Sequence, residues 1–260
     1  MKELTGKAGN HPGLSGYALK YLATAFMLCD HVAYFVIRRG LYAPWMSPEG
    51  GISFSDVPAY LLTANRVYWV LDILGRAAFP LFCFLLAEGA AHTRSRKAYL
   101  LTLLAFAAAT EPVYDWTHYG TVWNGALQNV LFTLTISCGQ LWVMEIVRVR
   151  WHRQTGRRRC LLALTAAAAG ALALLVRGEY VFLGTLSAAL FYLLREKGAW
   201  RLLGLAPLLA ASPWVALAAP LLLMYNGQRG RRGRKYFFYV FYPAHFLVLT
   251  ALGRLCAKKF

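Results

Sequence analysis

Long apolar runs, separated by short polar stretches, recur along the whole chain. They predict membrane-spanning helices, because a helix needs about 20 mainly apolar residues to cross a bilayer core of about 30 Å. The candidate spans are residues 19–37, 71–91, 98–112, 127–147, 160–176, 180–194, 202–225 and 237–255. Several are shorter than this, so some helices extend into flanking residues or re-enter the membrane. The pattern predicts an all-α, polytopic membrane helix bundle with about eight or nine transmembrane helices.

Two stretches depart from this pattern. Residues 1–18 are polar and glycine-rich, and no small-residue cleavage site follows the first apolar run. We therefore expect a cytoplasmic tail followed by a retained signal anchor. Residues 43–68 contain several prolines and glycines, which predict a long loop with one surface helix. No repeat or linker divides the rest, so residues 19–260 are expected to form a single transmembrane domain.

Basic residues gather between the apolar runs, as the positive-inside rule predicts for cytoplasmic loops. Three such loops are residues 92–98, 148–159 and 195–201. A cytoplasmic amino terminus places all three on the cytoplasmic side. The basic loop 225–235 joins them only if residues 202–225 cross twice, as a short hairpin broken at Ser212 and Pro213. We therefore favour nine crossings over eight.

Composition agrees with a membrane protein and argues against other classes. Hydrophobic residues make up 58% of the 260 residues, above the roughly 45–50% of soluble domains. The mean hydropathy is +0.44. The 28 basic and 11 acidic residues give a net charge of +17, but the cations lie between apolar runs, so we expect a lipid bilayer and not nucleic acid as the partner. The five cysteines show neither CxxC nor Cys/His spacing, so neither a disulfide framework nor a metal site is predicted.

Ionisable residues inside apolar runs are candidate functional residues, because an unpaired charge in lipid costs several kcal/mol. Lys20 and His31 are nearly three helical turns apart, so they share a helix face with about 16 Å between them along the axis. Asp30 is rotated by about 100° from His31, so we expect the two not to pair. Asp30 is instead expected to meet Arg76 on a neighbouring helix. Arg76 can alternatively pair with Asp72, one turn earlier.

Later runs supply further candidates. His245 follows Lys235 by ten residues, so its expected depth matches that of His31, and we expect both histidines to face a common pocket. Tyr242 shares the helix face of His245. Glu88 is either a general acid or base or the partner of a loop arginine. For each of these groups the alternative is an interhelical pair that only holds the bundle together.

A glycine-rich basic loop, YNGQRGRRGRK, precedes the last apolar run. Its candidate ligand-binding residues are Tyr225, Asn226, Gly227, Arg229, Arg231 and Lys235. Backbone amides of glycine-rich turns and clustered arginines both suit phosphate oxygens. The same composition also suits a topogenic loop that binds anionic lipid headgroups, so both interpretations stay open.

Five blocks of this sequence resemble, in order, the TraX family of membrane proteins. The blocks are LKYLATAFMLCDH, LGRAAFPLFCFLLAEGAAHTRSRKAYL, NVLFTL, LLLMYNGQRG and KYFFYVFYPAHFL, between residues 19 and 247. The family includes the pilin acetylase of conjugative pili and is similar to the wider group of integral-membrane acyltransferases that use acyl-CoA. Those enzymes carry a basic residue and a histidine, separated by ten residues, on their first membrane helix. Lys20 and His31 have that spacing, with Lys where the wider group usually has Arg.

The resemblance implies an acyltransferase of the bacterial cytoplasmic membrane that uses acetyl-CoA and no metal. Its acceptor would be the N-terminal amine of a peptide such as a pilin, or a hydroxyl of a peptide or glycan. The candidate catalytic residues are His31, Asp30, His245 and Glu88. The candidate acyl-CoA residues are those of the basic loop together with Lys20 and Arg76. The candidate substrate or oxyanion contacts are Asn129, Tyr239 and Tyr242.

Two other functions stay open. A transporter could use the buried ionisable residues as a proton path, although no inverted repeat is visible. The members of that path would be Asp30, His31, Glu88, Glu111 and His245. A non-catalytic assembly factor would use the same groups only to hold its helices together. Residues 41–68 and 148–224 match the family mainly by hydrophobicity, so we expect substrate choice to reside there.

Overall fold

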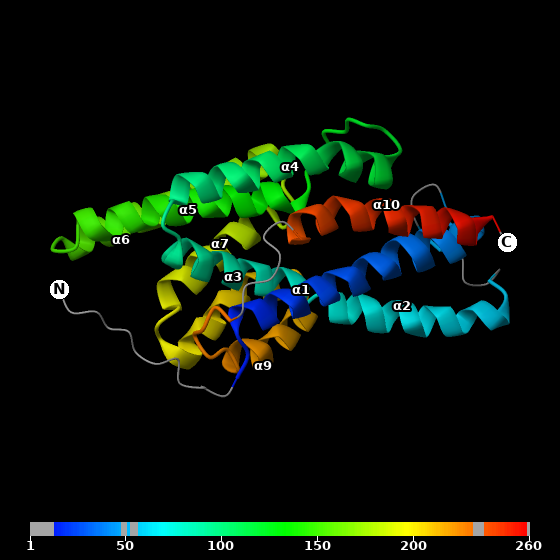
Figure 1. Cartoon of the computed structure of the whole chain (residues 1–260), viewed down its shortest axis with the longest axis horizontal. Coiled ribbons are helices and arrows are strands. Elements are labelled where there is room, and N and C mark those ends of the chain that lie inside the picture. The colour runs from blue at the N-terminus through cyan, green and yellow to red at the C-terminus, as the bar shows by residue number, and fades with distance from the viewer. Residues whose placement is uncertain (1–12, 48–50, 53–56, 231–236, 259–260) are drawn as a thin grey trace.

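The computed structural model describes residues 13–47, 51–52, 57–230 and 237–258 and shows an elongated bundle of helices (Figure 1), with no strand in these ranges. The longer helices are α1 (Gly16–His31), the π-helix η1 (Val32–Leu41), α2 (Leu62–Gly75), α3 (Ala78–His92), α4 (Arg96–Tyr119), α5 (Val130–Arg150), α6 (Thr155–Val176), α7 (Val181–Leu194) and α10 (Phe237–Ala257). The shorter ones are η2 (Ala43–Trp45), η3 (Ala59–Leu61), η4 (Gly198–Leu205), α8 (Ala206–Leu209), η5 (Pro213–Leu217) and α9 (Ala218–Leu223). The predicted all-α class is therefore confirmed.

Five continuous stretches of the described residues are long and apolar enough to cross a membrane. They are Gly16–Leu41, Leu62–His92, Val130–Arg150, Thr155–Val176 and Phe237–Ala257. The second begins well before the predicted start at residue 71, because α2 takes up part of the expected loop. Two turns of that loop are helical, at η2 and η3.

The joint between α2 and α3 explains how one long span bends. Pro80 lacks an N–H, and its ring clashes with the carbonyl four residues earlier, which belongs to Arg76. The helix breaks at Arg76 and Ala77 and restarts at Ala78. A proline kinks a helix through this clash, and here the kink lies one turn before Pro80, at the carbonyl with which its ring would clash.

Helix α4 runs through a proline at which the sequence predicted its end. Pro112 lies inside α4, which continues to Tyr119 and stops at Gly120 in the left-handed conformation, with φ at 77°. Prolines are tolerated within membrane helices because neighbouring groups satisfy the freed backbone carbonyl. The residues beyond Pro112 include His118, which lies near the candidate functional site described below.

The segment after α7 forms the expected hairpin, broken just before Pro213. Its arms, Gly198–Leu209 and Pro213–Leu223, are among the shorter apolar helices. At 1.5–2.0 Å per residue, arms of this length reach about 16–24 Å, less than the bilayer core of about 30 Å. Neither arm is therefore long enough for a full crossing by itself. The count of nine crossings and the side of the basic loop stay predictions.

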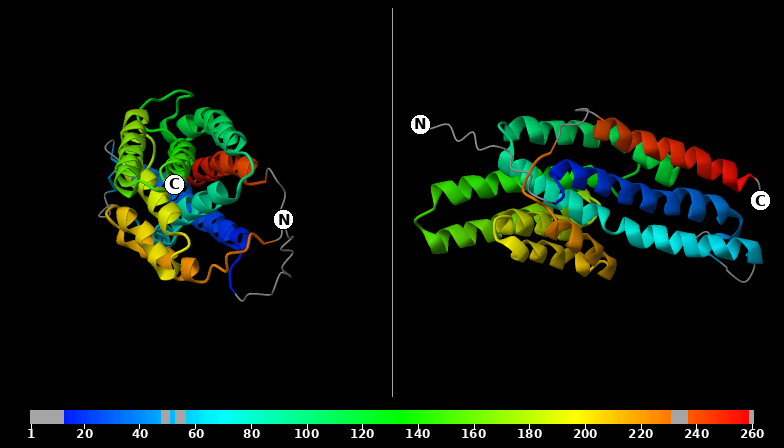
Figure 2. Two further views of the ribbon diagram at one scale, coloured as in Figure 1. Left: turned by 90° about the vertical axis from the view of Figure 1, so that its left-hand side faces the viewer. Right: turned by 60° about the horizontal axis from the view of Figure 1, so that its bottom comes forward.

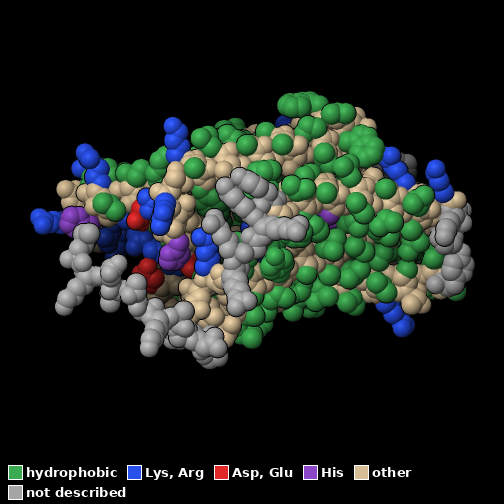
Figure 3. Space-filling model, in the orientation of Figure 1, with side chains coloured by type: hydrophobic (Ala, Val, Ile, Leu, Met, Phe, Trp, Pro, Cys, Tyr) green, Lys and Arg blue, Asp and Glu red, His purple; other side chains and the backbone are tan. Residues whose placement is uncertain are grey.

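The bundle has two distinct ends, and Figures 1 and 2 show the helices running between them. At the basic end lie the turns from α3 to α4 and from α5 to α6, together with the chain after α7. At the opposite end lie the end of η1, the start of α2 and the end of α10. Charged side chains gather at the basic end of the face in Figure 3, and apolar side chains cover most of the rest. The buried core centres on α3, which packs against α1 and α7.

Candidate functional site

Two histidines from opposite ends of the chain are in contact inside the bundle. His31 Nδ1 lies 2.5 Å from His245 Nε2, and the two rings are stacked, with 4.8 Å between centroids. His31 is the last residue of α1, and His245 lies two turns into α10, where only 5% of it is exposed. The two histidines that the matching depths place together are thus in direct contact.

The hydrogen bonds fix which ring nitrogens carry protons. His245 Nδ1 lies 3.1 Å from the carbonyl oxygen of Phe241, which can only accept, so His245 Nδ1–H donates. Its Nε2 must then accept, and the donor is His31 Nδ1–H. In the neutral tautomer His31 therefore keeps a free lone pair on Nε2. This is the arrangement of a base that is oriented by a second histidine.

Aromatic rings enclose the pair. Phe246 lies 4.8 Å and Phe35 lies 6.2 Å from the His31 ring, centroid to centroid, and Tyr242 lies 5.6 Å from that of His245. A third histidine, His118, faces Phe35 at 4.9 Å and Phe246 at 5.4 Å. These apolar rings screen the pair from water, which strengthens any charge interaction made there.

His118 was missed by the sequence reasoning, because the predicted helix ended at Pro112. Its Nδ1 donates to the carbonyl oxygen of Tyr114 at 2.8 Å. A signal was present: Glu111, Asp115 and His118 are spaced three to four residues apart, which places them on one face of a helix.

Lys20 lies on the same side of α1 as His31. Its Nζ is 4.1 Å from the ring centroid of Phe238 and 5.9 Å from that of Tyr239, a cation–π arrangement. Phe238 and His245 are two turns apart on α10, so Lys20 and His31 face the same side of that helix, as their spacing predicts. Tyr239 also stacks on Phe106 of α4, with 4.3 Å between centroids.

The loop after α9 pairs with the chain that starts α1. Backbone hydrogen bonds join Leu14 N to the Met224 carbonyl (2.7 Å), Gly16 N to that of Gln228 (2.8 Å) and Tyr17 N to that of Arg229 (3.0 Å). This junction of residues 13–17 with residues 224–229 places Arg229 close enough to Lys20 for their charges to interact. Tyr225, Asn226 and Gly227 belong to the junction, while Arg231 and Lys235 lie outside the described residues.

Within the junction, Tyr225 donates its hydroxyl proton to Glu88 Oε2 at 2.9 Å. Burial and then the Glu88 carboxylate raise the pKa of the Tyr225 phenol above its usual range, so the hydroxyl stays protonated and keeps donating. His92 approaches the same carboxylate at 3.8 Å. Among the described residues Glu88 therefore meets a tyrosine and a histidine and no loop arginine, the partner that one of its two predicted roles required. The joint between α2 and α3 packs on Asp30 and therefore lies at the level of the histidine pair. Glu88 is twelve residues, or roughly 18 Å, further along the helix, so it lies at the basic end and not beside the histidines.

We expect Tyr225→Phe to lower the free energy of unfolding by about 1–3 kcal/mol, because the substitution leaves the mostly buried Glu88 carboxylate without its hydroxyl donor. The midpoint of thermal unfolding in detergent measures this. Tyr21→Phe is the matched control, since Tyr21 is exposed and, within the described part of the chain, makes only ring contacts. Equal midpoints for both variants would contradict a structural role for the Tyr225–Glu88 bond.

Asp30 behaves only partly as predicted. It packs against the joint between α2 and α3, where a Cβ on Gly75 would lie 2.5 Å from its own Cβ. Arg76 is close enough to act on it electrostatically but forms its ion pair with Asp72, at 2.5 Å. Asp30 Oδ2 also lies 3.9 Å from His31 Nε2, which corrects the expectation that the two residues cannot meet. The side chains of adjacent helical residues can converge when both bend toward the same space between helices.

Arg76 forms the alternative pair with Asp72 that the sequence allows, and Asn129 lies in another setting than the predicted oxyanion contact. Arg76 is tied to Asp72 at the middle of the bundle and not among the cations of the basic end, so it does not fit an acyl-CoA site. The Asn129 side chain donates to Glu111 Oε2 and to the Ala107 carbonyl oxygen (3.0 Å), and its oxygen caps α5. Both of its polar groups are thus engaged in holding α4 to α5, so Asn129 has no amide free for an oxyanion.

Comparisons with known proteins give a family match and a similar protein. A family model described as TraX protein matches residues 15–253. A probable fimbrial assembly protein FimC, serogroup H1, from Dichelobacter nodosus is 27% identical over 273 residues, covering 94% of this chain and 96% of that relative. No solved structure gives a significant match.

Proposed function

Because the chain belongs to the TraX family, we propose that it is a membrane-embedded acyltransferase, which moves an acetyl group from acetyl-CoA to the N-terminal amine of a peptide or to a hydroxyl group. The observation that carries this proposal is the His31–His245 pair, whose His31 shares a helix face with Lys20, beside the basic junction. The name of the FimC relative favours a fimbrial or pilin subunit as the acceptor. We place the protein in the bacterial cytoplasmic membrane with the basic end inward.

The basic junction suits the nucleotide end of acetyl-CoA. Arginine guanidinium groups bind phosphate oxygens, and the glycines allow the backbone to approach them closely. Arg229 and Lys20 lie together there, and Gly227 and Gly230 adopt positive φ angles of 75° and 78°. The pantetheine arm is long enough to extend along the face that Lys20 shares with His31. The same arm would carry the thioester to the depth of the histidine pair.

The transfer then follows ordinary acyl chemistry. The acceptor's nitrogen or oxygen attacks the thioester carbonyl carbon while His31 Nε2 takes its proton, a contribution typically worth 10²–10⁴-fold. The carbon–sulfur bond breaks, and the CoA thiolate takes the proton back from His31, which leaves an acetylated acceptor and free CoA thiol. His245 accepts from His31 Nδ1–H and so keeps Nε2 directed at the substrate. Asp30, 3.9 Å from that nitrogen, stabilises the imidazolium formed in between.

Acetyl-CoA binding separates this function from its rivals. Purified full-length protein in detergent should gain thermal stability with acetyl-CoA and release CoA thiol when an acceptor peptide is added. A non-catalytic assembly factor, which the relative's name also favours, would do neither. A protein without an acetyl-CoA-dependent shift and without thiol release with any acceptor would overturn the enzyme proposal.

Replacing Arg229, Arg231 and Lys235 together with alanine is expected to raise the KM for acetyl-CoA about tenfold while kcat changes less, because ground-state contacts to the nucleotide are lost. Steady-state thiol release measures both constants. The matched control removes three cations from another basic loop, Arg153, Arg157 and Arg159. If both triple variants alter only membrane insertion, or raise KM equally, the loop after α9 is topogenic and does not bind acetyl-CoA.

A further inference from the structure

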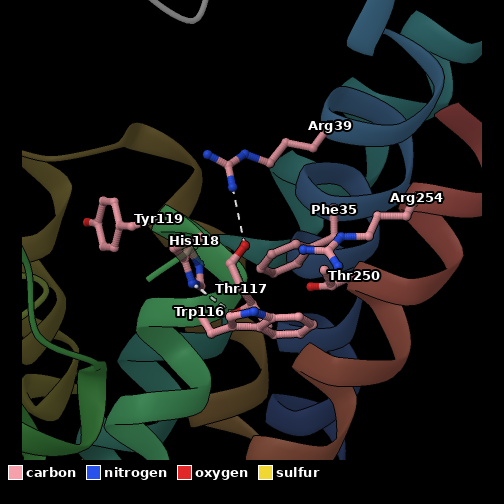
Figure 4. Close-up of a pocket in the computed structure, with 10 residues that line it drawn as sticks. Phe35, Arg39, Trp116, Thr117, His118, Tyr119, Thr250 and Arg254 are labelled. Atoms are coloured by element: carbon pink, nitrogen blue, oxygen red, sulfur yellow. Dashed lines mark hydrogen bonds between the residues drawn. The ribbon is translucent and has the colours of Figure 1, made fainter. Parts of the chain in front are cut away.

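A cavity of about 300 Å³ lies at the end of the bundle opposite the basic junction, between η1, the end of α4 and the end of α10 (Figure 4). Phe35 forms part of its floor, and Arg39, Trp116, His118 and Arg254 surround it. Nothing in the acyl-CoA site described above uses these residues. Phe35 and His118 are common to this cavity and to the surroundings of the histidine pair.

Two arginines are held over this cavity. Arg39 Nη1 donates to the Thr117 carbonyl oxygen at 3.2 Å, and the Arg254 guanidinium carbon lies 4.6 Å from the centroid of a Trp116 ring. No carboxylate among the described residues lies within 4.0 Å of either guanidinium. Cations that only sort loops to one side of the membrane would gather at the basic end, and these two lie at the other.

A buried hydroxyl group is a further hydrogen-bond donor at this cavity. Thr250 lines the cavity with only 8% of its surface exposed, and its Oγ1 has no hydrogen-bond partner among the described residues. An unsatisfied buried hydroxyl costs roughly 1–3 kcal/mol, so such a group signals a missing partner. Two guanidinium groups without a carboxylate partner and a hydroxyl without a hydrogen-bond partner, among the described residues, form a donor-rich site around one cavity, which is complementary to an anion.

The cavity lies next to the histidine pair. The rings of His118 and Phe35 are 4.9 Å apart, and those of Phe35 and His31 are 6.2 Å apart, so a single layer of aromatic rings separates the two spaces. Arg39 follows His31 by eight residues on the continuous helix of α1 and η1, which is roughly 12 Å along the axis. An extended peptide of three to four residues, about 10–13 Å long at about 3.3 Å each, spans that distance.

We propose that this cavity binds a carboxylate of the acceptor and thereby holds the acceptor's amine beside His31. The inference rests on the acetyl transfer proposed above and names the acceptor class: a peptide whose amine and carboxylate are about 10–13 Å apart, approached from the end opposite acetyl-CoA. Arg39 and Arg254 contact the carboxylate, Thr250 donates a further hydrogen bond, and Trp116 and Phe35 bound the apolar part of the ligand.

Tri-alanine and tri-alanine amide test this, because they have the same amine and differ only in the anion. Calorimetry on the full-length protein in nanodiscs of zwitterionic lipid, without acetyl-CoA, should give a Kd about tenfold lower for the acid. Substituting Arg39→Gln together with Arg254→Gln should remove the difference. Arg66→Gln, an exposed arginine on α2 at the same end, is the matched control and should keep it.

Acetylation of each peptide, followed by mass spectrometry, is the second measurement, with the acid expected to have about a tenfold higher kcat/KM. Preferential binding of the acid without acetylation of either peptide would support the cavity and overturn the acetyl transfer. Equal binding of the two peptides would overturn the proposed carboxylate site. If phosphatidylglycerol nanodiscs stabilise the protein through Arg39 and Arg254 and the acid gains nothing, the cavity holds a lipid headgroup and the proposal is wrong.

Discussion

Replacing His31 with alanine is expected to lower the rate of acetyl transfer by about 10²–10⁴-fold, the usual contribution of a general base. The alanine removes Nε2, the ring nitrogen whose lone pair is left free by the hydrogen bond between His31 and His245. The measurement is kcat for release of CoA thiol at saturating acetyl-CoA and acceptor. The loss should appear in kcat more than in the Kd of acetyl-CoA, because the proposed nucleotide contacts are Lys20 and its neighbour Arg229. Lys20 lies about 16 Å from His31 along the helix axis.

His152→Ala is the matched control for this prediction. His152 is an exposed histidine on the turn between α5 and α6, where its Nδ1 lies 3.2 Å from the Val149 carbonyl oxygen. It should retain full activity. A His31→Ala protein that folds, binds acetyl-CoA and transfers acetyl at the native rate would exclude His31 as the base and with it the mechanism proposed above.

The histidine pair and its partner Lys20 could be predicted from the sequence, because helical spacing is a local property. Lys20 and His31 share a face whatever their helix packs against, and the i, i+7 spacing of Phe238 and His245 does the same on α10. His31 and His245 follow the basic residues Lys20 and Lys235 at nearly equal sequence separations, which indicates equal depth in the membrane. The contact between His31 and His245 follows once α1 and α10 lie side by side.

What the sequence could not supply was the arrangement between helices. The π-helix η1 begins directly after His31, and its wider turns change which residues face α10 beyond that point. Arg39 and Thr117, 78 residues apart in the chain, meet because η1 and the end of α4 converge. The sequence offered both Asp30 and Asp72 as partners of Arg76, and the structure shows the ion pair with Asp72, one turn earlier on the same helix.

Gly253→Ala is expected to lower the free energy of unfolding by about 1–3 kcal/mol, the cost of overpacking a tight interface. Helices η1 and α10 approach each other at glycines: a Cβ on Gly40 would lie 2.9 Å from Gly253 Cα, and a Cβ on Gly253 would overlap the carbonyl oxygen of Phe35. Small residues allow such approach between membrane helices. Because backbone atoms stand opposite, no side chain can move aside, and the two helices must separate.

Gly139→Ala, by contrast, should not lower the free energy of unfolding, so a comparison of the two variants tests the close packing of η1 on α10. Gly139 lies inside α5, and a Cβ there would meet only Leu100 Cδ1, at an ordinary contact distance of 3.8 Å. Alanine is the better helix former by about 1 kcal/mol, so this variant should be as stable as the native protein or more stable. Thermal unfolding in the same detergent compares them. Separating η1 from α10 also draws His245 away from His31, so Gly253→Ala should lose acetyl transfer together with stability. If Gly253→Ala is as stable as Gly139→Ala, the close packing of η1 on α10 is refuted, and with it the geometry that holds the histidine pair.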